Sequence, residues 1–99
     1  MSFARTAFLL GAAPLAWAAH FLAVYALTGL ACARAAPGAV PWAIAVATIA
    51  AGALCVALIV RALRAPESFE NGLAAALAAM ALLAIAWEAL PAVLLRPCV

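Results

Sequence analysis

The chain has 99 residues, of which 74% are hydrophobic and only 8% are charged, and its formal net charge is +2. A soluble domain of this length could not bury so much apolar surface, so the composition indicates a membrane protein. The small net charge gives no reason to expect nucleic acid as a partner. The sequence also contains no Walker loop, dinucleotide-binding glycine pattern, CxxC or HExxH motif.

Three apolar runs each reach the roughly 20 residues that a helix needs to cross the hydrocarbon core of a bilayer. The sequence therefore predicts an all-α membrane protein with three transmembrane helices in an up-down-up bundle. We expect the helices at about residues 7–33, 41–63 and 72–95, within a single transmembrane domain covering residues 1–99. The polar connections are too short for a soluble catalytic domain, so the sequence predicts a protein that is not an enzyme.

Prolines and glycines mark the bends and turns along the chain. Pro14 removes an amide donor and should bend the first helix modestly. Residues 35–38 (AAPG) read as a tight turn, and Pro41 suits the first turn of the second helix. Residues 66–72 (PESFENG) form the only strongly polar stretch. The third helix follows it and should be bent by Pro91.

The arginines indicate the orientation in the membrane. Arg5, Arg61 and Arg64 lie on the side that holds the N-terminus and the second loop, whereas Arg34 and Arg96 lie on the other side. Three positive charges against two favour a cytoplasmic N-terminus and a periplasmic C-terminus in a bacterial inner membrane.

An alternative is that the first apolar run is a secretion signal. Residues 28–32 (TGLAC) faintly resemble a lipoprotein cleavage box, although the run is longer than a typical signal. Cleavage there would remove His20 from the mature protein.

The three cysteines suggest a register between the helices. The first and third helices run in the same direction, so Cys32 and Cys98 should emerge at the same face, which is the oxidising periplasm in the predicted orientation. A Cys32–Cys98 disulfide is expected, with two free thiols as the alternative. Cys55 lies within the second helix and is expected to be a buried packing residue.

His20 and Glu88 interrupt the first and third apolar runs, where an ionisable group needs a partner or a wet cavity. If Cys32 and Cys98 are level, His20 is level with Ala86, and Glu88 is about 3 Å away in height at 1.5 Å per residue. Glu88 should face protein because it shares a helix face with mostly small residues, Leu77, Ala81, Ala84 and Ala92. The residues expected to face lipid are Leu82, Leu83, Leu90 and Leu94.

Three interpretations of His20 and Glu88 remain open. The two side chains could form a hydrogen-bonded or ionic pair that locks the first helix to the third. They could instead bind a polar residue of a larger membrane complex. They could also carry chemistry, as a proton relay or with His20 as a metal or haem ligand. A single histidine is a poor metal site, so no metal or other cofactor is predicted.

Aromatic and polar side chains accompany the pair. Trp17 and Trp87 lie close to His20 and Glu88 in the sequence. They are expected to pack against other side chains or to lie at the membrane–water interface. Tyr25 lies C-terminal to His20 and could extend a polar path outward.

Two stretches carry a resemblance to a known family. They are residues 14–25 (PLAWAAHFLAVY) continuing to 31–34 (ACAR), and residues 87–91 (WEALP) continuing to 97–98 (PC). In these motifs the chain resembles small uncharacterised bacterial membrane proteins encoded beside haem–copper terminal oxidases of the cytochrome c oxidase type. The resemblance covers most of the chain and implies a respiratory accessory or assembly protein, without catalytic residues to transfer.

Together, these observations predict a non-catalytic integral membrane protein that acts as a small subunit or assembly factor of a respiratory complex. Its expected partners are the lipid bilayer and a larger membrane protein complex, such as a terminal oxidase. The alternative is a small proton-conducting, ion-conducting or transport oligomer that uses the intramembrane residues His20 and Glu88.

Overall fold

In a computed structural model, the chain forms three helices: α1 (Phe3–Ala33), α2 (Ala39–Arg64) and α3 (Phe69–Leu94). The structure describes residues 3–36, 38–94 and 98, with only the backbone for residues 92 and 93. Within this part of the chain there is no β-strand. All three helices are long and apolar enough to cross a membrane. The predicted all-α transmembrane fold is therefore confirmed.

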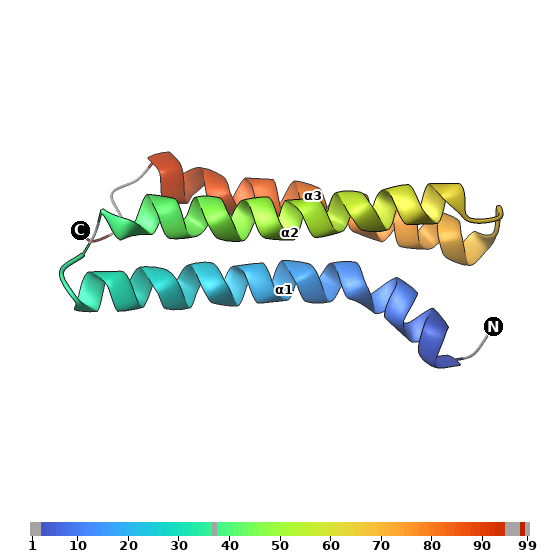
Figure 1. Cartoon of the computed structure of the whole chain (residues 1–99), viewed down its shortest axis with the longest axis horizontal. Helices are drawn as coiled ribbons and strands as arrows, with labels where there is room; N and C mark the ends of the chain where they lie inside the picture. Colours follow the sequence, from blue (N-terminus) through green and yellow to red (C-terminus); the bar gives the residue numbers. More distant parts are fainter. Residues whose placement is uncertain (1–2, 37, 95–97, 99) are drawn as a thin grey trace.

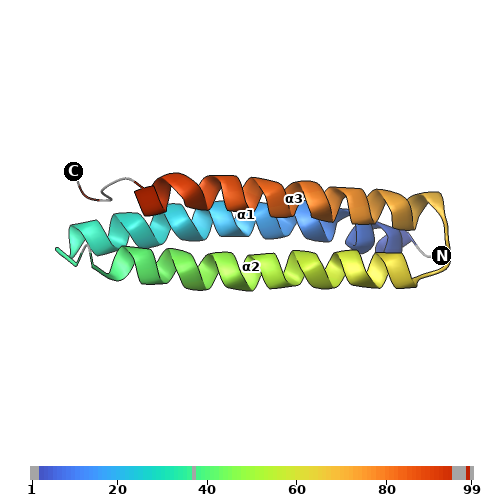
Figure 2. The ribbon, with the colours of Figure 1, turned by 90° about the horizontal axis from the view of Figure 1, so that it is seen from above.

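The helices form an elongated bundle of 50 × 23 × 15 Å. Each helix contacts the other two, and α2 runs antiparallel to α1 and α3 (Figures 1 and 2). Most large apolar side chains point outward, as a surface in contact with lipid requires. The up-down-up arrangement places α1 and α3 side by side and parallel.

The helix ends differ from the predicted ones by a few residues. The α1 helix begins at Phe3, and its N-terminal end, which precedes Pro14, bends away from the other helices (Figure 1). The α3 helix begins at Phe69 rather than near residue 72, because the Ser68 hydroxyl accepts a hydrogen bond from the Asn71 amide at 3.2 Å. A serine cap of this kind starts a helix. The polar stretch is thus partly helical.

The end of α1 is closed by backbone hydrogen bonds. The amide of Ala36 donates to the carbonyl of Ala31 at 2.8 Å, and the amide of Ala35 donates to that of Cys32 at 3.1 Å. This is the pattern of a Schellman motif, in which the penultimate residue takes a left-handed conformation. Ala35 does so, with φ at 54°. The motif turns the chain sharply toward α2 and fixes where Cys32 emerges.

The disulfide prediction agrees with the structure. Cys32 and Cys98 are bonded, with their Cα atoms 5.5 Å apart. Cys55 is a free cysteine with no exposed surface, as expected of a packing residue. The predictions that involve Arg96 and the side chain of Ala92 lie outside the described residues.

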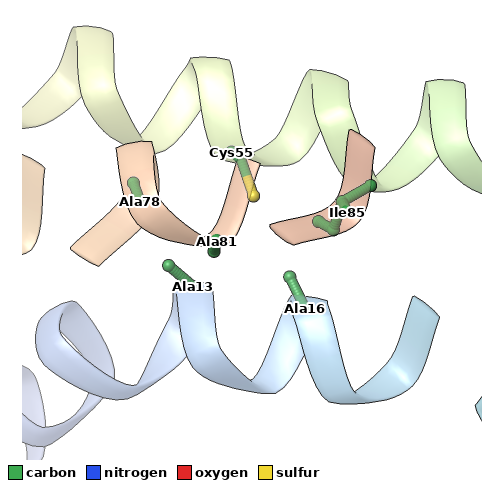
Figure 3. Packing of buried hydrophobic residues seen from close by; sticks show 6 residues of the cluster. All are labelled: Ala13, Ala16, Cys55, Ala78, Ala81 and Ile85. Carbon is green, nitrogen blue, oxygen red and sulfur yellow. The ribbon is translucent and has the colours of Figure 1, made fainter. Parts of the chain in front are cut away.

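The interior of the bundle is built mainly from small side chains. We call the buried cluster the alanine core; its members are Ala13, Ala16, Cys55, Ala78, Ala81 and Ile85 (Figure 3). Small side chains let the backbones of neighbouring helices approach closely, which is how transmembrane helices gain packing contacts. The alanine core therefore holds the helices together through close approach rather than through large interlocking side chains.

One lipid-facing prediction was wrong. Leu82 is partly buried and packs against the alanine core, whereas Leu83, Leu90 and Leu94 are exposed as expected. The reason is that α3 contacts both other helices, so its buried face is wider than a single stripe.

Candidate functional site

A polar layer crosses the interior of the bundle and joins all three helices. It consists of His20 from α1, Thr48 from α2 and Glu88 from α3. The His20 ring lies between the other two: its Nδ1 is 3.2 Å from Glu88 Oε2, and its Nε2 is 3.0 Å from Thr48 Oγ1. The His20 side chain has no exposed surface, and that of Glu88 is 20% exposed. The expected meeting of His20 and Glu88 at one depth is confirmed.

Helical periodicity places the layer directly beside the alanine core. His20 lies four residues after Ala16, on the same face of α1. Glu88 follows Ile85 by three residues, on the same face of α3. Thr48 follows the buried Ile44 by four residues on α2. Each polar residue therefore continues the buried stripe of its own helix.

The geometry restricts which protons the layer can hold. A net charge inside a membrane is costly, which favours states in which imidazole and carboxyl are together neutral. One such state is an imidazolium beside a carboxylate; the other is a neutral imidazole that accepts a proton donated by Glu88. In both states Nε2–H donates to the Thr48 oxygen, and only the proton between Nδ1 and Oε2 changes position.

In both of these states Thr48 is the hydrogen-bond acceptor for the His20 ring. Its hydroxyl accepts from the ring, and its own hydrogen remains available for a carbonyl one turn earlier in α2. Thr48 was not among the residues predicted from the sequence to belong to the site. Its signal was its position: Thr48 is the only hydroxyl-bearing residue in the apolar run 40–60.

The carboxyl group of Glu88 lies where the polar layer meets the surface of the bundle. It borders an open groove of about 530 Å³, whose other lining residues are apolar or aromatic: Trp17, Met80, Leu83, Ala84 and Trp87. We call this depression the tryptophan groove. The Oε2 atom of Glu88 bonds to His20, so Oε1 is available to accept a further hydrogen bond at the edge of the groove.

The aromatic residues singled out in the sequence separate into two places. Trp17 and Trp87 flank the tryptophan groove, and the Trp17 ring also contacts Phe21, with 6.5 Å between ring centroids. Tyr25 is 76% exposed and lies in a different surface depression, together with Thr28 and Cys32. The structure therefore does not place Tyr25 on a path that leads out from His20.

Metal or haem binding at His20 would require the layer to rearrange. Both ring nitrogens are engaged, one by Glu88 and the other by Thr48. Among the described residues, no three histidine, cysteine or acidic side chains gather as a metal site. An external ligand at His20 would have to displace one of the two hydrogen bonds.

Comparisons with protein-family models, with curated proteins and with solved structures find no match to this chain. The polar layer and the groove beside it are therefore the features that point to a function.

Proposed function

We propose that this protein is a small, non-catalytic membrane subunit or assembly factor that docks against a larger membrane complex. The observation that carries the proposal is the position of Glu88. Its carboxyl group is held by His20 on one side and borders the tryptophan groove on the other. An acceptor at the edge of an apolar groove, at membrane depth, calls for a hydrogen-bond donor from outside the bundle.

The occupant that best fits the groove is a transmembrane helix of the larger complex. Such a helix would supply apolar side chains to the groove and one donor side chain opposite Glu88. Tryptophan is enriched at the energetic centres of protein interfaces, because its large ring buries much area at small entropic cost. Trp17 and Trp87 line the same groove as Glu88 and would serve as these anchors.

The surroundings of the polar layer favour docking over conduction. Toward one end of the bundle lies the alanine core, and toward the other lie the buried side chains of Ile44 and Val40. A proton entering His20 would therefore meet apolar packing in both directions within the bundle. The competing function, a conducting oligomer, would need its path between copies of the chain, along the tryptophan groove.

The cellular context of the proposal comes from the sequence. The resemblance to proteins encoded beside haem–copper oxidases suggests a respiratory complex, such as a terminal oxidase, as the partner. We place the protein in a bacterial inner membrane, where the arginine asymmetry favours a cytoplasmic N-terminus and a periplasmic C-terminus.

The test is purification from native membranes in a mild detergent, followed by mass spectrometry. We expect the protein to co-purify with a larger complex, and Trp87→Ala to release it. Trp42→Ala is the matched control, because Trp42 is 76% exposed and Trp87 is 74% exposed, but only Trp87 lines the groove. Equal retention of the partner by both variants would exclude the groove as the docking site.

Reconstitution of the purified protein alone distinguishes the competing functions. A conducting oligomer would pass protons or ions across vesicles, and Glu88→Gln would change the rate. Haem binding by a dimer would give a Soret band that His20→Ala removes. Our proposal predicts neither signal, and either one would replace it.

A further inference from the structure

A second cavity lies at the opposite end of the bundle from the disulfide, far from the polar layer. Its volume is about 400 Å³, and it is formed where the bent N-terminal end of α1 separates from α2 and α3 (Figure 1). Two arginines, Arg5 from α1 and Arg61 from α2, line it together with Ser68 and Asn71 from the start of α3. Leu9 and Ala62 supply the apolar part of its wall.

The lining groups are suited to an anion. Two guanidinium groups offer forked sets of N–H donors that match phosphate oxygens. The Ser68 hydroxyl oxygen accepts a hydrogen bond from the backbone amide of Asn71. The hydroxyl hydrogen of Ser68 can therefore donate to a ligand. The Asn71 side-chain amide donates a hydrogen bond to the Pro66 carbonyl at 2.7 Å, and this bond ties down the loop that lines one side of the cavity.

The position of the cavity favours a lipid over a dissolved ion. It lies at the level where the apolar helices end and the polar loop of residues 65–68 begins, which is the level of lipid headgroups. Its apolar wall includes Leu9 from α1 and Ala62 from α2, which suits the start of an acyl chain. Arg64 adds a further positive charge at this end, and Glu67 lines the adjoining hollow rather than this one.

We propose that this cavity binds the phosphate of an anionic phospholipid headgroup between Arg5 and Arg61. The bend before Pro14 opens the space, the two guanidinium groups clamp the phosphate, and the acyl chains lie along the apolar surface below it. Basic pockets between transmembrane helices are known sites for such headgroups. This site is independent of the tryptophan groove, so either proposal can fail without the other.

The experiment uses the full chain in nanodiscs and in detergent. Native mass spectrometry would count retained lipids after exposure to phosphatidylglycerol mixed with phosphatidylcholine, or to phosphatidylcholine alone. We expect selective retention of phosphatidylglycerol, reduced about fivefold by Arg5→Gln and again by Arg61→Gln, since each arginine near the surface contributes a factor of this size. The control is Arg34→Gln, which removes the same charge at the opposite end of the bundle.

Three outcomes would overturn the proposal. Equal loss in Arg34→Gln would mean that only overall charge matters. Competition by inorganic phosphate would mean that the cavity takes a free anion and not a lipid. Equal retention of phosphatidylcholine would mean that the anionic headgroup is not recognised. If Arg61→Gln proves unstable in circular dichroism, Arg61→Lys replaces it, because it keeps the charge but loses the forked contact and should still reduce selectivity.

Discussion

The polar layer and the alanine core lie on neighbouring turns of the same three helices, yet they join them in different ways. In the polar layer, one imidazole ring bonds to two other helices at 3.0 and 3.2 Å. In the alanine core, the contacts are nondirectional, and most of the buried side chains that make them consist of a single methyl group (Figure 3). The first arrangement fixes orientation, whereas the second permits close approach.

This difference matters more in a membrane than in water. Lipid tails are as apolar as leucine, so burial from water does not press the helices together. Small side chains also tolerate rotation and sliding of one helix against another, because no single contact is unique. The depth and rotation of α1 relative to α3 should therefore be set mainly by His20, Glu88 and the disulfide, with the alanine core supplying the packing.

The largest effect should come from His20→Ala. The substitution removes both hydrogen bonds and leaves Glu88 and Thr48 without their ring partner, which should destabilise the bundle by about 2–3 kcal/mol. Unfolding in mixed micelles, followed by circular dichroism, measures the loss. The result would also show how much of the helix pairing depends on directional hydrogen bonds rather than on nondirectional packing.

Glu88→Gln is the matched test of that interpretation. The glutamine amide can donate to Nδ1 while Nε2–H still donates to Thr48, so the neutral form of the layer survives. We expect this variant to unfold within about 1 kcal/mol of the parent. A loss as large as that of His20→Ala would show that the layer needs the ion pair, and that hydrogen bonding alone does not hold it.

The next effect tests the alanine core. Ala78 has no exposed surface, and Ala78→Leu should force α3 away from its neighbours at a cost of about 1–3 kcal/mol. Ala79→Leu is the control, because residue 79 is exposed on the next position of the same helix and should be nearly neutral. Micelle unfolding of both variants gives the comparison. Similar stabilities would mean that the core does not require small side chains.

Much of this arrangement could be predicted from the sequence, because distance along a helix is proportional to residue number. Counting back from Cys32 and Cys98 was enough to place His20 and Glu88 at one depth. Thr48 was not found, because nothing in the sequence fixes how far α2 slides relative to the other helices. Leu82 was misassigned for a related reason: a helix that packs against two neighbours buries positions that a one-stripe pattern assigns to lipid.

Thr48→Val should have an intermediate effect. It removes the acceptor for Nε2–H at nearly constant volume, which should cost about 0.5–1.5 kcal/mol, the range of hydrogen bonds between transmembrane helices. Thr28→Val is the control, since Thr28 is also half-buried but lies outside the polar layer. If the free energy of unfolding changes equally in both variants, the loss comes from replacing any half-buried threonine by valine. Thr48 would then not orient the His20 ring.

The smallest effect should be a gain, in Gly52→Ala beside the alanine core. A methyl group added at Gly52 would meet the Leu82 side chain at 3.6 Å, an ordinary van der Waals contact. Alanine also restricts the unfolded backbone, so stability should rise by about 0.5–1 kcal/mol. Gly29→Ala separates the two causes, because nothing lies within 4 Å of its added methyl group and only the backbone term applies. If micelle unfolding shows a larger gain in stability for Gly52→Ala than for Gly29→Ala, the difference measures the contribution of packing against Leu82. A net loss of stability in Gly52→Ala would mean that α2 and α3 already lie as close as a glycine allows.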